Sequence, residues 1–409
     1  MENLKDKAKI YALKNAVEHG GSAVAGAVLN SLFAEGLEKS EIKNVMPVIN
    51  EVLEEVNSMS EDKQEELLAE HSTEISHREV REGLPELPDV PKSGVVMRIA
   101  PSPSGPLHLP HAINLSLNYD FVKEYGGKLY VRIEDTNPET VYPKAYKMIE
   151  SEANWLTNSE IEIVVQSDRI DLYYDYAKKL IEKNAAYICS CAPEDFKTKY
   201  AELKENCPCR NNDKKENLMR WGKMLSEDSK TNYKSGEVVL RFKTPEKYEG
   251  MKNPNPAMRD FSLARINETK HPRQGKKYRV WPLMNLAVTV DDIELGMTHI
   301  IRGKDHRDNA KRQEMIFEIF GKKYPWVFFL GFLNFTGFEF STRKMRADIE
   351  EGKYSGWDDP ALPTVASLKK QGYKPEAFWK FAEHVGLSAT DKKMDKEDFF
   401  EVLDRFNRE

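Results

Sequence analysis

A chain of 409 residues is long for a single hydrophobic core, so several domains are expected. Charged residues make up 31% of it, the mean hydropathy is −0.64, and no apolar run approaches the roughly 20 residues of a membrane-spanning helix. The first residues, MENLKDKAKI, do not match a secretory signal, so a cytoplasmic enzyme is expected.

The net charge of −6 hides an asymmetry along the chain. Residues 1–92 carry 10 Lys and Arg against 19 Asp and Glu, whereas residues 192–280 carry 21 against 13. A basic segment in an acidic chain favours a surface that faces a polyanion. A solvated lysine-rich face is the alternative that charge alone leaves open.

The first 80 residues are predicted to form helices. Val45, Ile49, Val52 and Val56 recur at helical spacing, and Gly20-Gly21 separates an earlier helix from a small-residue helix. The proline-rich stretch 83–93, GLPELPDVPKS, is the first clear linker.

A βαβ unit follows this linker. Val95–Ala100 is predicted as a strand, Pro101–Pro106 as a turn and Leu129–Ile133 as the next strand. Between them, apolar residues at helical spacing predict a helix that stops at Gly126-Gly127. Parallel pairing of the two strands is expected.

The remaining chain alternates again between helical and strand patterns. A helical stretch is predicted over about 139–185, and residues 345–409 are predicted to be helical. Between them come the basic segment and then, in order, a strand, a second strand, a helix and a third strand: Leu286–Val290, Thr298–Arg302, Asn309–Phe320 and Trp326–Leu330. The fold class is therefore α/β, a doubly wound parallel Rossmann-type domain with an α+β insertion, an N-terminal helical domain and a C-terminal helical segment.

All four cysteines lie within 21 residues, as Cys189-Ser-Cys191 and Cys207-Pro-Cys209. In a cytosolic protein such pairs indicate metal binding rather than a disulfide, and four thiolates suit a structural Zn²⁺. The C-x-C spacing is tighter than the usual C-x₂-C, so reduced free thiols remain the alternative.

The most informative stretch runs from Arg98 to Ala112, RIAPSPSGPLHLPHA, between the first strand and the first helix of the sheet. Doubly wound folds bind nucleotides at this place, and a helix N-terminus favours phosphate. His108 and His111 would add donors there. Two surface histidines would explain His-x-x-His alone, but not the Pro-Ser-Pro-Ser-Gly before it.

This stretch resembles the signature of class I aminoacyl-tRNA synthetases of the glutamyl/glutaminyl group, whose second half is the HIGH motif. Four further stretches resemble that family in the same order: YGGKLYVRIEDTNPE, DDIELGMTHIIRGKDH, FSTRKMR and YSGWDDPALPTVASLKKQGY. FSTRKMR is similar to the mobile KMSKS-type loop in its archaeal glutamyl form, and the N-terminal helical region also looks like the archaeal glutamyl branch.

The resemblance implies a glutamate–tRNA ligase that uses ATP with Mg²⁺ and acts on tRNA(Glu). It leaves open whether tRNA(Gln) is a second acceptor. It implies that Arg98, Ser102, Glu134, Met284 and Arg302 bind glutamate. It implies that His108, His111 and Lys344 are catalytic, and that ATP contacts His108, Pro110, His111, Gly303, Asp305, Ser341, Thr342 and Lys344. Internal salt bridges at strand ends are the alternative for Arg98, Glu134 and Arg302.

Three features depart from the family pattern. Pro110 replaces the HIGH glycine, which normally lets adenine approach the backbone, and Met284 stands where a tyrosine hydroxyl contacts the substrate amino group. The chain also stops about where the family's C-terminal anticodon-binding β-barrels begin.

The expected domains are an N-terminal helical domain, the first catalytic half, an acceptor-stem-binding insertion with the zinc site, the second catalytic half, and the KMSKS-type loop with a helical stem-contact segment: 1–92, 93–188, 189–280, 281–340 and 341–409. A catalytically weakened relative that binds tRNA or a partner is the alternative function. A glutaminyl enzyme is a third hypothesis, although it should carry the MSK form of the loop. The acidic N-terminal helices are a candidate surface for a protein partner.

Overall fold

The computed structural model of the chain describes residues 4–18, 20–34, 37–38, 41–70 and 83–408. It divides into two compact units, Met1–Arg81 and Glu82–Glu409. Residues 71–82, which fall inside the predicted domain 1–92, lie outside the described residues. Among the described helices, none combines the length and the apolar character that a membrane crossing requires.

The first unit consists of helices packed on one small core. Their bounds are α1 (Leu4–Glu18), α2 (Ala25–Ala34), α3 (Ile42–Asn57) and α4 (Glu61–Glu70). Leu13, Leu32 and Ile49 from three of the helices are completely buried together. The helical spacing of Val45, Ile49, Val52 and Val56 marks the buried face of α3, as predicted.

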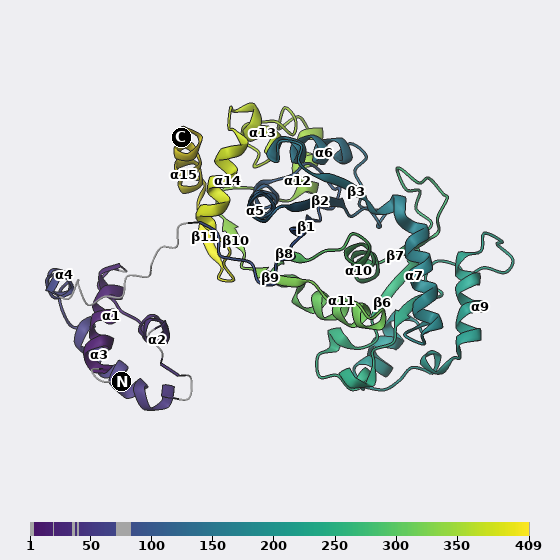
Figure 1. The fold of residues 1–409 in the computed structure, drawn as a ribbon, viewed down its shortest axis with the longest axis horizontal. Helices are drawn as coiled ribbons and strands as arrows, with labels where there is room; N and C mark the ends of the chain where they lie inside the picture. The colour runs from purple at the N-terminus through teal and green to yellow at the C-terminus, as the bar shows by residue number, and fades with distance from the viewer. Residues whose placement is uncertain (1–3, 19, 35–36, 39–40, 71–82, 409) are drawn as a thin grey trace. The chain divides into compact units, whose positions relative to one another are not determined.

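A parallel sheet forms the centre of the second unit (Figure 1). Its strands are β1 (Val95–Ile99), β2 (Gly127–Ile133), β3 (Glu162–Val165), β8 (His299–Gly303) and β9 (Trp326–Leu330). β2 pairs in parallel with both β1 and β3, and β8 pairs in parallel with β9. The Thr298 N–H donates to the Val96 carbonyl at 3.0 Å, which sets β8 alongside β1. The resulting order, β3-β2-β1-β8-β9, is that of a doubly wound sheet.

Helices cover both faces of this sheet. The crossover helix α5 (Leu109–Tyr125) and α6 (Ala145–Leu156) share one core with β1 and β2. α10 (Met284–Glu294) and α11 (Arg307–Ile319) pack against each other, and α10 contacts the other side through Asp292, which bonds to Arg98 of β1 and Arg132 of β2. β1 and β2 approach closely at Gly127, the first residue of β2, because a Cβ there would lie 1.9 Å from the Val95 carbonyl oxygen.

An antiparallel sheet with its own core interrupts the parallel one. Its strands, in order, are β4 (Ala186–Cys189), β5 (Val239–Phe242), β6 (Ser262–Ile266) and β7 (Val280–Pro282). Helices α7 (Ile170–Glu182), α8 (Pro193–Asp195) and α9 (Lys214–Leu225) belong to this region. The sheet thus begins three residues before the predicted insertion 189–280, and the boundaries of the inner domains stay predictions.

The C-terminal part of the chain packs against the core that β1 and β2 share with α5 and α6. It contains β10 (Leu333–Phe335), α12 (Thr342–Glu350), α13 (Val365–Lys370), α14 (Pro375–Val385), β11 (Lys392–Met394) and α15 (Lys396–Arg408). Phe378 and Phe381 of α14 are completely buried in the core that α5 shares. This packing fixes the C-terminal helices against the parallel sheet.

Three predictions of element type are wrong in whole or in part. Leu286–Val290 is not a strand but lies within helix α10. The helical stretch 139–185 contains strand β3, and the helical region 345–409 contains strand β11. Leu286–Val290 is buried on all sides, so its apolar run lacks the polar face that would reveal a helix. Strand β3 has only four residues, too few to establish a period of two.

Candidate active site

All five residues that the sequence predicts to bind glutamate line one cavity of about 270 Å³. Arg98 belongs to β1 and Arg302 to β8, whereas Glu134 directly follows β2. Ser102 lies in the turn after β1, and Met284 is the first residue of α10. The cavity therefore lies at the carboxyl ends of adjacent parallel strands, where this type of sheet binds ligands.

The cavity wall carries an excess of positive charge. Arg98 and Arg302 are 4% and 7% exposed, and Glu134 is the one carboxylate among the described residues that line the wall. Burial, followed by repulsion from Arg98, lowers the pKa of Arg302 to about 10. Burial also lowers the pKa of His306, another wall residue, so its ring is neutral at pH 7. Two guanidinium groups against one carboxylate leave one positive charge for a ligand to neutralise.

Arg302 has an unused hydrogen-bond donor. Its Nη1 donates to Gln313 Oε1 at 2.8 Å, but its buried Nε has no partner among the described residues. A buried donor without a partner costs free energy unless a ligand or water satisfies it. Because Arg302 lines the cavity, its guanidinium supports a carboxylate ligand there.

A second cavity of about 460 Å³ adjoins the first and shares part of its wall. Four of the residues predicted to contact ATP line it: Pro110, His111, Gly303 and Asp305. Its other walls are mostly apolar. They come from the end of β9, the start of β10 and the two residues between them, and from the end of α14 with the segment that leads to β11; they include Leu330, Phe332, Leu333 and Val385. A large, mainly apolar cavity beside a helix N-terminus suits a nucleotide base and its phosphates.

His108 and His111 meet at the start of α5. His108 is the N-cap residue and Pro110 occupies the first turn, where a proline fits a helix. The centroids of the two imidazole rings lie 4.0 Å apart, and each ring has a buried Nδ1 with no partner in the part of the chain that the structure describes. Burial lowers the pKa of His111 to about 4, and burial together with His111 lowers the pKa of His108. Both rings are neutral at pH 7, so each offers a single N–H donor.

The loop that bears Lys344 lies outside both cavity walls in this structure. Ser341 caps α12, and its hydroxyl accepts the Lys344 backbone N–H at 3.3 Å. The Lys344 ammonium pairs with Glu339 and is largely exposed. Thr342 packs on the signature turn so closely that a Cβ on Gly105 would lie 2.2 Å from its Cγ2. His108 is not in either wall, although its ring adjoins His111.

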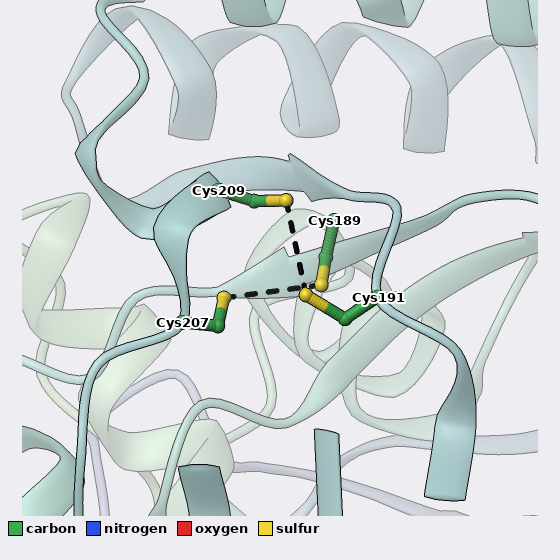
Figure 2. A group of neighbouring side chains, drawn as sticks. All are labelled: Cys189, Cys191, Cys207 and Cys209. Atoms are coloured by element: carbon green, nitrogen blue, oxygen red, sulfur yellow. Dashed lines mark hydrogen bonds between the residues drawn. The ribbon is translucent and has the colours of Figure 1, made fainter. Parts of the chain in front are cut away.

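The four cysteines converge, as their spacing predicts. Cys189 and Cys191 come from the end of β4 and the turn beyond it, and Cys207 and Cys209 come from a short helical turn; their sulfur atoms gather in one place (Figure 2). All four Sγ atoms lie within 4.8 Å of one another, and two pairs are 3.9 and 4.0 Å apart. Tetrahedral Zn–S bonds of about 2.3 Å place two sulfurs about 3.8 Å apart. The residues thus fit a Cys₄ metal site.

Comparison with known proteins identifies the family. Residues 94–406 match the family model described as tRNA synthetases class I (E and Q), catalytic domain. The glutamate–tRNA ligase of Methanocaldococcus jannaschii is 43% identical over 98% of this chain and 70% of its own length. That of Pyrococcus abyssi is 44% identical over 93% of this chain and 66% of its own length. The chain belongs to this family.

This class I synthetase chain thus spans about two thirds of the length of such curated relatives. A crystal structure of a glutamate tRNA ligase from Elizabethkingia meningosepticum is 23% identical, has a TM-score of 0.47, and is matched over 71% of this chain and 60% of its own. The predictions of the family, the fold class and a glutamate–tRNA ligase as the class of enzyme are confirmed. The roles of individual residues stay predictions.

Several residues of the synthetase site were not predicted. Asn114 lines both cavities, and so does His306, which was noted only as the last residue of a motif. Asn114 lies three residues after His111 in α5, so helical spacing could have indicated it. Arg132 and Asp292, both buried behind the smaller cavity, were also missed.

Proposed function

We propose that this synthetase binds glutamate in the smaller cavity and ATP in the larger one. It activates the glutamate with the ATP and then transfers it to tRNA(Glu). The observation that carries the proposal is the charge of the smaller cavity. Its walls supply Arg98, Arg302 and Glu134, which complement the two carboxylates and one ammonium group of glutamate. Glutamate has a net charge of −1 and would neutralise the excess positive charge of the wall.

In the first step, an oxygen of the glutamate α-carboxylate attacks the α-phosphorus of ATP, and the bond to pyrophosphate breaks. Such a step depends on positioning and on stabilising phosphate charge. The imidazole N–H groups of His108 and His111 would donate to phosphate oxygens at the start of α5. Lys344 would neutralise the pyrophosphate side once it leaves Glu339. Mg²⁺, which class I synthetases use with ATP, would neutralise phosphate charge.

In the second step, a terminal ribose hydroxyl of tRNA attacks the carbonyl carbon of glutamyl-adenylate, and AMP leaves. The basic segment of residues 192–280 is proposed to hold the acceptor end of tRNA above the cavities. Its net charge of +8 in an acidic chain supports this role. The acidic first unit is proposed to bind a protein partner, and the cytoplasm is the proposed location.

The activity is tested by ATP–pyrophosphate exchange with tRNA(Glu) present. Glutamate should support exchange, and glutamine should not. Charging of tRNA(Gln) with glutamate, measured in parallel, decides whether a second acceptor is used. ATP–pyrophosphate exchange that does not depend on glutamate would overturn the proposal.

We expect one tightly bound zinc per chain at the four cysteines. The sulfur spacing supports a tetrahedral site that joins β4 to the following turn. Elemental analysis of protein purified without chelator should give close to one equivalent. Replacing Cys191 and Cys209 with serine should remove the metal, whereas Ser190→Ala should retain it. A metal content below about a tenth of an equivalent, with four titratable thiols, would favour free cysteines.

We expect the double variant Lys276→Glu/Lys277→Glu to weaken tRNA binding and to leave ATP binding unchanged. Lys276 lines a surface cavity with Tyr174, Tyr278 and Arg279, an arrangement suited to phosphate and base contacts. Losing two phosphate contacts should lower the slope of log K against log salt by about 1.4 to 1.8.

The matched control for this experiment is Lys322→Glu/Lys323→Glu, a second exposed lysine pair. It precedes β9, at the end of the sheet opposite the cavities. Filter binding at several salt concentrations compares the two variants. Equal effects of both would mean that only overall charge matters and that the basic segment is a solvated face.

A further inference from the structure

One buried aspartate lies behind the glutamate cavity and contacts two arginines at once. Asp292 of α10 is 1% exposed. Its Oδ1 accepts from Arg98 Nε and its Oδ2 from Arg98 Nη2, both at 3.1 Å. Its Oδ1 also accepts from Arg132 Nη1. Asp292 is separated by 194 residues from Arg98 in sequence, so the fold alone creates this contact.

The bidentate contact fixes the guanidinium of Arg98. Two parallel bonds to one carboxylate hold the guanidinium plane and its rotation. They occupy the Nε–Nη2 edge and leave the Nη1 corner of this cavity-lining residue for a ligand. Although burial alone would raise it, Arg98 and Arg132 keep the pKa of Asp292 below its usual value, so the carboxylate stays charged.

Arg132 extends the contact to the ammonium side of the cavity. This arginine of β2 is completely buried, and its Nη2 donates to Glu134 Oε1 at 2.9 Å. Its guanidinium therefore bridges Asp292 and Glu134. Glu134 lines the cavity, whereas neither Arg132 nor Asp292 is among the residues that line it.

We propose that Asp292 is the positioning residue of the glutamate cavity, setting Arg98 directly and Glu134 through Arg132. It thereby orients a carboxylate-binding group and the ammonium-binding group from a single point that never touches the substrate. A site whose groups are held before binding loses less side-chain entropy when the ligand arrives. The inference rests on the proposed glutamate activation and adds a residue to it.

The neighbouring Asp291 provides a matched comparison. It is also completely buried in α10, but it accepts from Arg169, Gln166 and Tyr173. Its contact with the positioning network is a longer ion pair of 3.8 Å to Arg132 Nε. Asp291 thus joins α10 to α7 and the turn before it, whereas Asp292 joins α10 to the cavity.

The test compares Asp292→Asn with Asp291→Asn in tRNA-dependent ATP–pyrophosphate exchange. Asp292→Asn keeps the side-chain volume but turns one acceptor into a donor that faces a guanidinium. We expect its KM for glutamate to rise about tenfold with KM for ATP unchanged, the change that loss of about 1.4 kcal/mol in glutamate binding gives. Asp291→Asn should lower the melting temperature about as much as Asp292→Asn does. It should leave the KM values for glutamate and ATP within about twofold of those of the unaltered protein.

A third variant separates the two branches. Arg132→Lys keeps the charge beside Asp292 but cannot bridge to Glu134. It should weaken the binding of glutamate but leave the binding of glutarate unchanged, because glutarate has both carboxylates but no ammonium group. Glutarate binding is measured by competitive inhibition. Asp292→Asn should weaken glutamate and glutarate alike. Arg132→Lys also keeps the test open if Asp292→Asn fails to fold.

The outcomes separate this inference from the proposed function. If the two aspartate variants lower the melting temperature alike and neither changes KM for glutamate, Asp292 is only structural. Equal weakening of glutarate by Arg132→Lys would overturn the branch to Glu134. If the unaltered protein shows no glutamate-dependent exchange, the proposed function itself fails. A glutamate-induced rise in melting temperature, lost in Asp292→Asn, would then still support the positioning role.

Discussion

Replacing Arg302 with glutamine is expected to raise KM for glutamate by more than a factor of about one hundred. Arg302 lines the cavity, and the fork geometry of its guanidinium suits a carboxylate. Each hydrogen bond to a charged group contributes about 1.5–3 kcal/mol, so losing two costs roughly 3–6 kcal/mol, or at least two powers of ten. KM for ATP should change little, because Arg302 does not line the larger cavity.

The same substitution should also reduce the preference for glutamate over glutamine. It removes the excess positive charge of the cavity, which is the feature that favours a second carboxylate. Arg307→Gln is the matched control, since this exposed arginine of α11 lies over Phe329 and is in neither wall. The measurement is exchange with each amino acid for both variants. An unchanged KM for glutamate with a lower kcat would assign Arg302 to the phosphate chemistry instead.

The sequence could predict much of this site because each motif ends a strand of one parallel sheet. Arg98, Glu134 and Arg302 come from separate motifs, yet the carboxyl ends of β1, β2 and β8 bring them into one wall. The close spacing of the four cysteines likewise predicts their convergence. In both cases local sequence and a known topology are enough.

The residues behind the wall could not be predicted in the same way. In the sequence, Asp292 and Arg132 look like any acidic and basic residue near a strand or helix. Their role depends on their contact with each other, and they are 160 residues apart in the sequence. The strand predicted at Leu286–Val290 shows a related limit. That segment is buried on every side of α10, so neither a period of two nor one of 3.6 is visible. Tertiary packing decides both cases.

The two departures from the family motif occupy different cavities. Met284, the first residue of α10, is 39% exposed and lines the smaller cavity, where glutamate is proposed to bind. Its thioether cannot donate a hydrogen bond, so it offers nothing to a substrate carboxylate and little to an ammonium group. Pro110 lies in the first turn of α5 and lines the nucleotide cavity. Its ring fills space there, and it lacks the N–H that other residues would offer near the phosphates.

The double variant Pro110→Gly/Met284→Tyr is therefore expected to raise glutamate-dependent aminoacylation by more than about tenfold, and by roughly a hundredfold if each change restores one bond to a charged group of about 1.5 kcal/mol. The tyrosine should lower KM for glutamate, and the glycine should lower KM for ATP, because the two residues line different cavities.

Two single variants separate the causes. Met284→Phe supplies the ring without the hydroxyl and should not improve glutamate binding. Pro110→Ala restores the N–H but keeps a Cβ, so it should recover only the part that the N–H contributes. His108, His111 and Lys344, which are predicted to stabilise the phosphates, are all present, so the unaltered chain should be slow rather than inactive. A double variant that stays inactive with full-length tRNA would show that holding the substrates is not what limits this chain, and would favour a role in binding tRNA without charging it.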